Sequence, residues 1–286
     1  MLEIIRTVSD MRALTYAWRS QGSKVGLVAT MGALHKGHLS LIDHAMAECD
    51  KVIVSIFVNP MQFSVSEDLE AYPRNEEQDL AALENIGVSI AYTPSVKEIY
   101  GEDFATRIEV GRLTECMCGT ARPGFFSGVA TVVAKLLNQC APDRAYFGEK
   151  DYQQLLVIRQ LVKDLNIPSE IIGCPIIRDE NGLALSSRNT YLNNQQRRVA
   201  AALFETLQEA ASNLVKGATC NEVEKWAATT LKSAGFDNVE YIDVRDGITL
   251  EKTDIIYGSE SSTRIFGAAI LDSTRLIDNV PVKVDV

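Results

Sequence analysis

The sequence lacks the features of membrane-spanning, secreted and nucleic-acid-binding proteins. It contains no run of about 18 consecutive apolar residues, the length that a transmembrane helix needs. Its first residues, MLEIIRTVSDMR, have no apolar core behind basic residues, so we expect no signal peptide. It also lacks an excess of positive charge, because the formal net charge is -10. Nucleic-acid binding needs a basic face, and we therefore expect neither a nucleic-acid nor a membrane partner.

Cysteines are few, and their spacing is not typical of a metal or redox site. The one close pair among the six, Cys116 and Cys118, is separated by a single residue, whereas common zinc and redox motifs use a two-residue spacer. Without a signal peptide, the thiols are expected to be reduced, as in cytoplasmic proteins. We therefore predict a cytoplasmic protein without a structural zinc site.

Histidine is scarce, and all three histidines lie in one segment, TMGALHKGHLSLIDHA (30–45). His38 and His44 would be separated by about 240° around a helix, so they do not share a face. His35 precedes the helix, and one metal ion bound by all three side chains is not expected. We interpret His44 as an ordinary helix residue and look for another role for His35 and His38.

The first 176 residues alternate between short apolar segments and segments of helical periodicity. KVIVSIFV (51–58) is almost continuously apolar, which is typical of a strand buried on both faces. The pattern predicts strands at 24–30, 51–58, 88–93 and 143–147, and helices at 38–48, 75–87, 124–140 and 151–165. Strands separated by helices indicate right-handed crossovers and an α/β domain with a parallel sheet covered on both faces.

The pattern changes after residue 176. RDENGLALSSRN (178–189) is polar and rich in turn-forming residues. Helical periodicity then covers 193–215 and 221–235, and strands are predicted at 239–246 and 263–280, with a turn at Asp272–Ser273. We therefore expect two domains, 1–176 and 177–286, of which the second is a smaller α+β domain.

Three polar segments follow three strands of the predicted parallel sheet, at 30–38, 59–63 and 148–151. Ligands of open α/β sheets bind beyond the carboxyl ends of the strands, so this edge is the expected site. Gly37 removes side-chain bulk where a helix begins, and the first N–H groups of a helix attract phosphate. His35 and His38 would add donors there. The alternative is that both histidines only cap or pack the helix.

Five motifs occur in the order found in one enzyme family: TMGALHKGH (30–38), IFVNPMQF (56–63), YPR (72–74), FGEKDYQQL (147–155) and LSSRN (185–189). With TRLIDN (274–279), they make the chain resemble the pantothenate synthetase (pantoate–β-alanine ligase) family of the His-x-Gly-His nucleotidylyltransferase superfamily. The resemblance implies a Rossmann-like domain, a smaller domain that closes over the site, ATP and Mg²⁺ as cofactors, and a homodimer. It also implies that pantoate reacts with ATP to give pantoyl adenylate and pyrophosphate, and that β-alanine then gives pantothenate and AMP.

The resemblance assigns roles to individual residues. His38, as proton donor, His35 and Lys150 are implied to be catalytic, and Gln62 and Gln154 to bind pantoate, with Gln62 also near β-alanine. The implied ATP-binding residues are Thr30, Met31, Gly32, Ala33, Leu34, His35, Lys36, Gly37, His38, Gly148, Glu149, Lys150, Asp151, Ile177, Leu185, Ser186, Ser187 and Arg188. We expect Mg²⁺ to rest mainly on ATP oxygens and waters and assign it no protein ligand. If the resemblance is set aside, the sequence is also consistent with Lys150 as a solvated lysine in a loop. It is likewise consistent with Gln154 as a surface residue.

Two details concern the pantoate side of the predicted site. Asn59–Pro60 is expected to keep the chain extended from the buried strand as far as Gln62. Phe125 stands where members of the family commonly have histidine, close to the expected pantoate pocket, so the affinity for the substrate is expected to differ.

Two other function classes remain open. Another nucleotidylyltransferase of the same superfamily would share the histidine motif but would not account for Gln62 and Gln154. A catalytically silent nucleotide-binding protein would not need His35, His38, Lys150 and Arg188, all of which are present.

Overall fold

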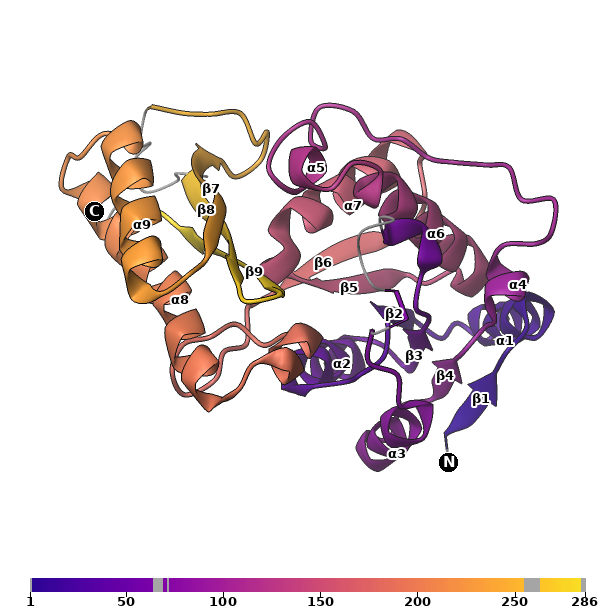
Figure 1. Ribbon diagram of the computed structural model, residues 1–286. Coiled ribbons are helices and arrows are strands. Elements are labelled where there is room, and N and C mark those ends of the chain that lie inside the picture. Colours follow the sequence, from indigo (N-terminus) through magenta and orange to yellow (C-terminus); the bar gives the residue numbers. More distant parts are fainter. Residues whose placement is uncertain (1, 64–68, 71, 255–262, 284–286) are drawn as a thin grey trace. The chain divides into compact units, whose positions relative to one another are not determined.

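A computed structural model describes residues 2–63, 69–70, 72–254 and 263–283 of the chain. The chain forms two compact units. The first comprises Met1–Glu149 and Gln154–Pro175, and the second comprises Lys150–Gln153 and Ile176–Val286. Each unit is built around its own sheet, with six strands in the first unit and three in the second (Figure 1).

The first unit contains the predicted parallel sheet, in the order β1-β4-β3-β2-β5-β6. Its strands are β1 (Glu3–Ile5), β2 (Val25–Thr30), β3 (Lys51–Ile56), β4 (Ile90–Tyr92), β5 (Arg144–Gly148) and β6 (Glu170–Cys174). From β2 the chain proceeds to β3 and β4 on one side, and it later adds β5 on the other side of β2. The strand order therefore reverses at β2, and ligands of such folds bind at this point. β1 and β6 extend the predicted sheet at its two edges.

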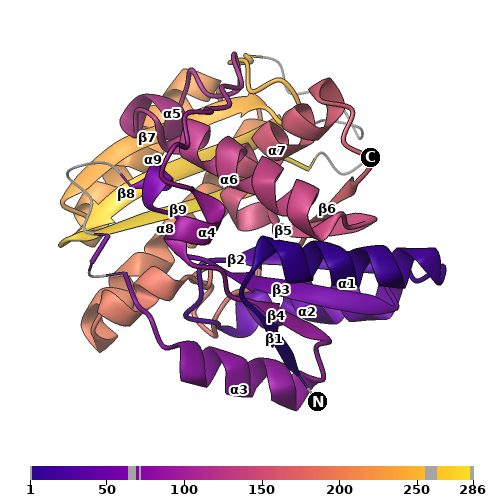
Figure 2. The same cartoon turned by 90° about the vertical axis from the view of Figure 1, so that its right-hand side faces the viewer.

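Helices cover both faces of this sheet, which explains why its central strands are apolar throughout. Leu41 and Ile42 of α2 and Leu83 of α3 pack with Val54 of β3 in one cluster, and Figure 2 shows α1, α6 and α7 on the opposite face. The helices are α1 (Val8–Ser20), α2 (Lys36–Glu48), α3 (Glu76–Ile86), α4 (Val96–Ile99), α5 (Cys118–Ala121), α6 (Phe125–Cys140) and α7 (Tyr152–Asp164). Strands enclosed in this way have no polar face.

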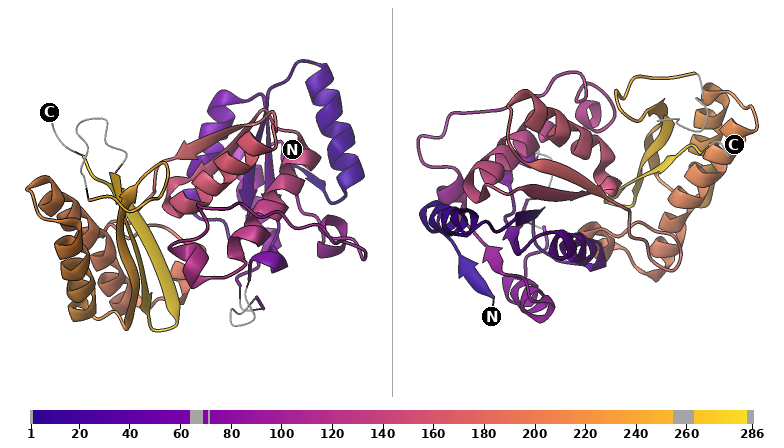
Figure 3. Two further views of the ribbon diagram at one scale, coloured as in Figure 1. Left: turned by 90° about the horizontal axis from the view of Figure 1, so that it is seen from above. Right: turned by 180° about the vertical axis from the view of Figure 1, so that it is seen from behind.

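The second unit pairs two helices with an antiparallel sheet in the order β7-β8-β9. Its elements are α8 (Asn194–Val215), α9 (Cys220–Ala234), β7 (Asn238–Asp246), β8 (Thr263–Leu271) and β9 (Thr274–Pro281). Asp272 adopts a φ of 55° in the tight turn between β8 and β9, where the sequence predicted a turn. Figure 3 shows α8 and α9 lying together along one face of this sheet. The predicted fold class, a parallel α/β sheet with a smaller α+β part, is confirmed.

Two further observations concern the cysteines and the helices. None of the six cysteines, all within the described ranges, forms a disulfide. Among the helices of the described residues, none is both long enough and apolar enough to cross a bilayer.

Candidate active site

The turn that follows β2 winds through two left-handed residues. Thr30 ends the strand, and its hydroxyl donates to the carbonyl of Ser55 at 2.8 Å while accepting from the N–H of Gly32 at 3.2 Å. Gly32 has a φ of 81° and Ala33 a φ of 50°. A Cβ atom on Gly32 would lie 2.9 Å from Oδ2 of Asp79. Glycine is therefore required here by both backbone conformation and space.

The carboxylate of Asp79, on α3, binds the backbone of this turn. Its Oδ2 accepts from the N–H of Ala33 at 2.9 Å, and its Oδ1 accepts from the N–H of Leu34 at 2.8 Å. The side chain is buried, and burial raises the pKa of Asp79, although the two N–H bonds act in the opposite direction. A carboxylate that engages two consecutive amides fixes the path of the backbone directly before His35. Sequence reasoning missed this role, since Asp79 lies in a run of acidic and polar residues.

His35 and His38 lie at the start of α2. His35 is the N-cap residue, and its Nδ1 accepts from the N–H of Gly37 at 3.1 Å. Nδ1 is therefore the acceptor, and in the neutral ring Nε2 carries the proton. The ring centroids of His35 and His38 lie 4.0 Å apart. His35 thus caps the helix, as the alternative interpretation required, and it also places two imidazoles together where a helix N-terminus attracts anions.

The other two basic residues of this segment are exposed. Lys36 is exposed at the first position of α2, and His44 is exposed farther along the same helix. His44 lies six positions after His38 on this helix, about 240° around its axis, so the two side chains do not share a face.

The segment that carries Gln62 differs from the prediction. β3 ends at Ile56, and Pro60–Gln62 forms a 3₁₀ turn, η1, so the chain is not extended as far as Gln62. The reason is local, because proline fits the first position of a helical turn and the Asn59 side chain accepts from the N–H of Met61 at 3.2 Å. The prediction of an extended segment was wrong.

Asn59 fixes the orientation of the Gln62 amide. Its Nδ2 donates to Oε1 of Gln62 at 3.0 Å and to the carbonyl of Gly128 at 3.1 Å, and its Oδ1 accepts from the hydroxyl of Tyr100 at 2.7 Å. Asn59 is only 1% exposed. Oε1 of Gln62 thus accepts a hydrogen bond from Asn59, and Nε2 of Gln62 points away from Asn59, toward Met31. Sequence reasoning missed Asn59, whose pairing with proline signals only a turn.

Gln62 meets the turn after β2 through Met31. Nε2 of Gln62 lies 3.2 Å from Sδ of Met31, so the side chain predicted to bind pantoate contacts the segment predicted to bind ATP. This contact brings together two of the three polar segments expected at the carboxyl edge of the sheet.

Phe125 lies next to the same segment. The Arg122 guanidinium stands 3.6 Å from the centroid of the Phe125 ring, in cation–π geometry, and its Nη2 donates to the carbonyl of Gln62 at 3.3 Å. The ring therefore helps to place a cation that holds the Gln62 backbone. Unlike the histidine that the resemblance leads us to expect at this position, a phenylalanine ring offers no titrating group.

The segment after β5 supplies another group of predicted ATP-binding residues. Gly148 ends β5, and a Cβ atom built on it would meet no atom within 4 Å. Glu149–Asp151 forms a 3₁₀ turn, η2, in which Nζ of Lys150 lies 3.4 Å from Oδ2 of Asp151. Gln154 is half-buried in the first turn of α7. In the described part of the chain, it makes no hydrogen bond to the segment of Gln62.

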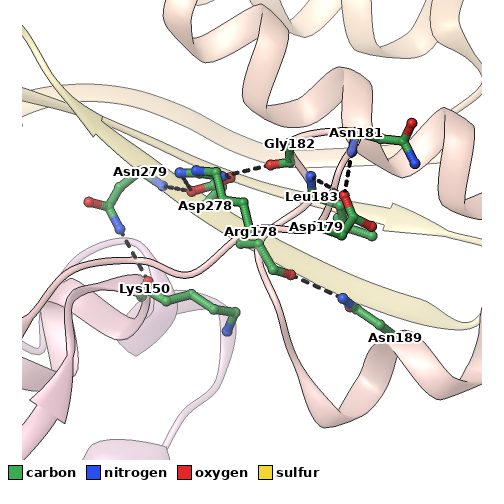
Figure 4. Close-up of polar contacts among 10 residues, drawn as sticks. Lys150, Arg178, Asp179, Asn181, Gly182, Leu183, Asn189, Asp278 and Asn279 are labelled. Atoms are coloured by element: carbon green, nitrogen blue, oxygen red, sulfur yellow. Dashed lines mark hydrogen bonds and ion pairs between the residues drawn. The ribbon is translucent and has the colours of Figure 1, made fainter. Parts of the chain in front are cut away.

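The remaining predicted residues lie on a hairpin of the second unit. The N–H of Leu185 donates to the carbonyl of Ile177 at 2.9 Å, and Arg178 pairs with Ala184. Ser186 then caps a 3₁₀ turn, η3 (Ser187–Tyr191), by accepting from the N–H of Arg188 at 3.3 Å. Figure 4 shows the hairpin together with Lys150 and residues of β9. Within this unit, the predicted ATP residues therefore lie on short, firmly bonded turns.

No protein cage for a metal is evident in this part of the molecule. Across the residues that the structure describes, no group of three or more His, Cys, Asp or Glu side chains is arranged to hold an ion.

The chain is similar to one family of enzymes over almost its whole length. Residues 3–281 match the family model described as pantoate-beta-alanine ligase. The pantothenate synthetase of Rhodospirillum rubrum is 48% identical over 281 residues, covering 98% of this chain and 99% of the relative. That of Caulobacter vibrioides is 46% identical, covering 98% of each.

Solved structures agree with these relatives. A pantothenate synthetase structure from Thermus thermophilus has a TM-score of 0.92 at 42% identity, covering 99% of this chain and 100% of that one. A pantoate-beta-alanine ligase from Francisella tularensis, described as complexed with beta-gamma ATP and beta-alanine, has a TM-score of 0.83 at 37% identity, covering 99% and 98%.

Proposed function

The chain belongs to the pantoate-beta-alanine ligase family, and from this we infer that it condenses pantoate with β-alanine to form pantothenate, with ATP cleaved to AMP and pyrophosphate. One observation of the site supports this inference most directly. The Gln62 amide, oriented by Asn59, lies 3.2 Å from Met31 in the turn that leads to the paired histidines. This amide has a fixed orientation and lies beside the turn that is predicted to bind ATP phosphates. Such an amide suits a substrate that carries hydroxyls and a carboxylate.

We propose that the reaction begins with adenylation. A carboxylate oxygen of pantoate attacks the α-phosphorus of ATP, the bond to the bridging oxygen breaks, and pyrophosphate leaves with the electron pair. Negative charge accumulates on phosphate oxygens, so the protein contributes positioning and fixed donors. His35 and His38 supply such donors at the N-terminus of α2, with His38 as the proton donor, and Lys150 supplies a cation.

The wider ATP site is proposed to use the same residues that the motifs indicate. These are Thr30 to His38 on the turn and helix start, Gly148, Glu149, Lys150 and Asp151 after β5, and Ile177, Leu185, Ser186, Ser187 and Arg188 on the hairpin. The short turns support this assignment, because they carry hydroxyl or cationic side chains of the kind that suit phosphate and ribose.

Pantoate is proposed to bind through Gln62 and Gln154. Because Oε1 of Gln62 is engaged by Asn59, Nε2 is the atom that donates to a carboxylate or hydroxyl oxygen of pantoate. In the second step, the β-alanine amine attacks the acyl carbon of pantoyl adenylate. The new C–N bond replaces the acyl–phosphate bond, AMP leaves, and the amine loses a proton.

We further propose that the reaction uses Mg²⁺, which would neutralise charge on the ATP phosphates, and that the enzyme works as a homodimer in the cytoplasm. Six cysteines held as thiols fit a reducing compartment. The dimer rests on the resemblance to the family alone.

The proposed function is tested by an assay with defined omissions. ATP and pantoate without β-alanine should exchange labelled pyrophosphate into ATP, because adenylation is reversible and precedes the amine. Adding β-alanine should then release AMP and pantothenate in equal amounts. Product formation without pyrophosphate exchange would rule out the adenylate, and pyrophosphate exchange without an amide product would favour a different nucleotidylyltransferase.

A further inference from the structure

We propose that Asp278 and Asn279, consecutive residues of β9, are positioning residues for the reaction of ATP. Asp278 would fix the hairpin that leads to Arg188, and Asn279 would fix the backbone of Lys150. The proposal rests on the proposed function, which assigns Lys150 and Arg188 to the phosphates of ATP. All of these residues belong to the second unit.

Neighbouring residues on a strand point to opposite faces of its sheet, and the register of β9 shows which face each residue occupies. Asp278 lies opposite Gly267 and Asn279 lies opposite Phe266. A Cβ atom on Gly267 would lie 3.1 Å from Leu203 of α8, so Asp278 shares the face that α8 covers. Asn279 consequently lies on the other face.

On the helix-covered face, Asp278 holds Arg178. Its carboxylate accepts two hydrogen bonds from the guanidinium, with 2.9 Å between Nη2 and Oδ1. Arg178 also donates to the carbonyl of Gly182 at 3.0 Å and lies 3.5 Å from the centroid of the Phe204 ring. The Asp278 side chain is 3% exposed, so this is a buried, bidentate pair. It ties the first arm of the hairpin to β9, and Arg178 also holds the tip of the hairpin at Gly182.

The hairpin transmits this restraint to the segment of Arg188. Asp179 accepts from the N–H groups of Asn181 and Leu183 at 2.9 and 3.0 Å, which closes the tip of the hairpin. Nδ2 of Asn189 donates to the carbonyl of Ala184 at 3.0 Å, which binds the η3 turn to the returning arm. The backbone at Arg188 is therefore held by hydrogen bonds of Ser186, before it, and of Asn189, after it.

On the other face, Asn279 holds Lys150. Nε of Arg264 donates to Oδ1 of Asn279 at 2.8 Å, which sets the orientation of the amide. Nδ2 then donates to the carbonyl of Lys150 at 3.1 Å. The Arg264 guanidinium also stacks 3.9 Å from the centroid of the Tyr152 ring, two residues after Lys150. The backbone of Lys150 is thus held at its own carbonyl and again at Tyr152.

The two restraints meet on one rigid strand, as Figure 4 shows for Asp278 with Arg178 and Asn279 with Lys150. Two cationic segments that are distant in sequence are therefore held by adjacent residues. Positioning matters for a reaction that needs little covalent help, because a displacement of about 1 Å can lower a rate by about a hundredfold.

The decisive variant is Asn279→Asp in the full-length enzyme. A carboxylate has the shape of the amide and still accepts from Arg264, but it cannot donate to the carbonyl of Lys150. We expect pyrophosphate exchange with ATP and pantoate to fall about tenfold or more. The reaction of chemically prepared pantoyl adenylate with β-alanine should change less than about twofold, because pyrophosphate has already left. A loss of folded enzyme would lower both rates equally.

Glu240→Gln is the matched control. Glu240 lies on β7 of the same sheet and accepts from Nε of Arg275 of β9 at 2.8 Å, so the variant weakens an ion pair of this sheet without touching Asp278 or Asn279. Both half-reactions should stay at the wild-type rate. Equal losses in both half-reactions for Asn279→Asp, or no loss in either, would overturn the inference. Wild-type enzyme that forms no pantothenate would instead contradict the proposed function.

Asp278→Asn tests the other restraint. It keeps one acceptor for Arg178 but removes the charge, so the Michaelis constant for ATP should rise by about tenfold while that for β-alanine is retained. The melting temperature is measured in parallel. An unchanged Michaelis constant for ATP in folded Asp278→Asn protein would remove Asp278 from the proposal. If this variant does not fold, Asn279→Asp decides the inference.

Discussion

At the residue scale, the candidate site depends on side chains that orient other groups. Asn59 directs the amide of Gln62, Asp79 directs the backbone before His35, and His35 caps the helix that carries His38. Each uses much of its hydrogen-bonding capacity inside the protein. Such residues lower the reorganisation that a reaction would otherwise require.

Replacing His38 with alanine should lower the adenylation rate by about a hundredfold or more, the scale for losing one transition-state donor. Lys150→Ala should do the same, because the proposed function assigns its cation to the phosphates of ATP. Pyrophosphate exchange measures both effects, and the melting temperature should stay near the wild-type value. His44→Ala is the matched control, since it removes an exposed imidazole from the same helix. Near-normal exchange in either variant would remove that residue from the catalytic set.

Gln62→Ala should impair the use of pantoate while leaving ATP binding almost unchanged. The truncation leaves substrate oxygens without a fixed donor, at about 1–3 kcal/mol, or about tenfold to more than a hundredfold in kcat/KM for pantoate. Kinetics with varied pantoate and calorimetry with ATP separate the two ligands. Weak ATP binding together with normal pantoate use would show that Gln62 serves the other substrate.

The titration of Asp79 should appear in the pH dependence of stability. Burial raises the pKa of Asp79 above its ordinary value of 3.8. Protonated Asp79 therefore stabilises the folded state relative to ionised Asp79. This stabilisation is complete below pH 3.8, the ordinary pKa, and it is lost as pH rises through the raised pKa of the folded state. The free energy of unfolding of the wild type, minus that of Asp79→Asn, should fall with rising pH in urea titrations between about pH 3.5 and 7. A difference that grows with pH would mean that the bonds to Ala33 and Leu34 dominate over burial.

The sequence predicted the residues that carry motifs and missed those that support them. His35, His38 and Lys150 lie in polar, turn-forming segments after predicted strands, whereas the role predicted for Gln62 came from the resemblance to the family. Asn59 and Asp79 act through partners that only the fold brings near, as with the contact between Asp79 and Ala33, 46 positions apart. No local pattern distinguishes such an aspartate from a solvated one.

At the element scale, the close approach of α6 to η1 shapes the segment of Gln62. A Cβ atom on Gly128 would overlap the carbonyl oxygen of Met61 and lie 2.7 Å from the nitrogen of Gln62. These are backbone atoms, so a side chain at position 128 must displace the whole turn. The helix therefore sets where Gln62 stands.

Gly128→Ala should raise the Michaelis constant for pantoate by about tenfold or more, because the displaced turn carries Gln62 away from its place. Binding of ATP alone should be affected much less. Gly101→Ala is the control, since a Cβ atom there would meet nothing within 4 Å. Unchanged kinetics for pantoate in folded Gly128→Ala would show that the turn relaxes without consequence.

Strongly periodic helices such as α3 and α6 were predicted well, whereas α1 (Val8–Ser20) and the strands β1 and β6 were not predicted. The helices predicted at 75–87 and 124–140 correspond to α3 and α6, because Asn75 and Gly87 mark the ends of the first and the second is almost wholly apolar on one side. β1 has three residues, too few for any period to show. The 3₁₀ turn at Pro60–Gln62 was missed because proline also fits an extended chain.

At the scale of the whole molecule, each unit has a hydrophobic core of its own. Leu207 of α8 is fully buried in the core of the second unit, against which Trp226 packs. Trp18 lies on α1 in the first unit. The two tryptophans of the chain thus lie in different units.

Leu207→Ala should destabilise the second unit by about 2–5 kcal/mol, through lost apolar contacts and the cavity left behind. In proteins with a single tryptophan, made by Trp18→Phe or Trp226→Phe, the unfolding midpoint reported by Trp226 should fall more than that reported by Trp18. Identical shifts at both tryptophans would show that the two cores unfold as one.

The assignment of Lys150–Gln153 to the second unit also bears on how such a protein can evolve. A gene fragment that begins at the codon for residue 176 would encode the three-stranded sheet and both of its helices, but not Lys150 or Tyr152. It would leave Asn279 without the carbonyl that it binds and Arg264 without the ring on which it stacks. A single recombination junction therefore cannot transfer the complete second unit. Four of its codons, for Lys150–Gln153, lie within the coding sequence of the first unit.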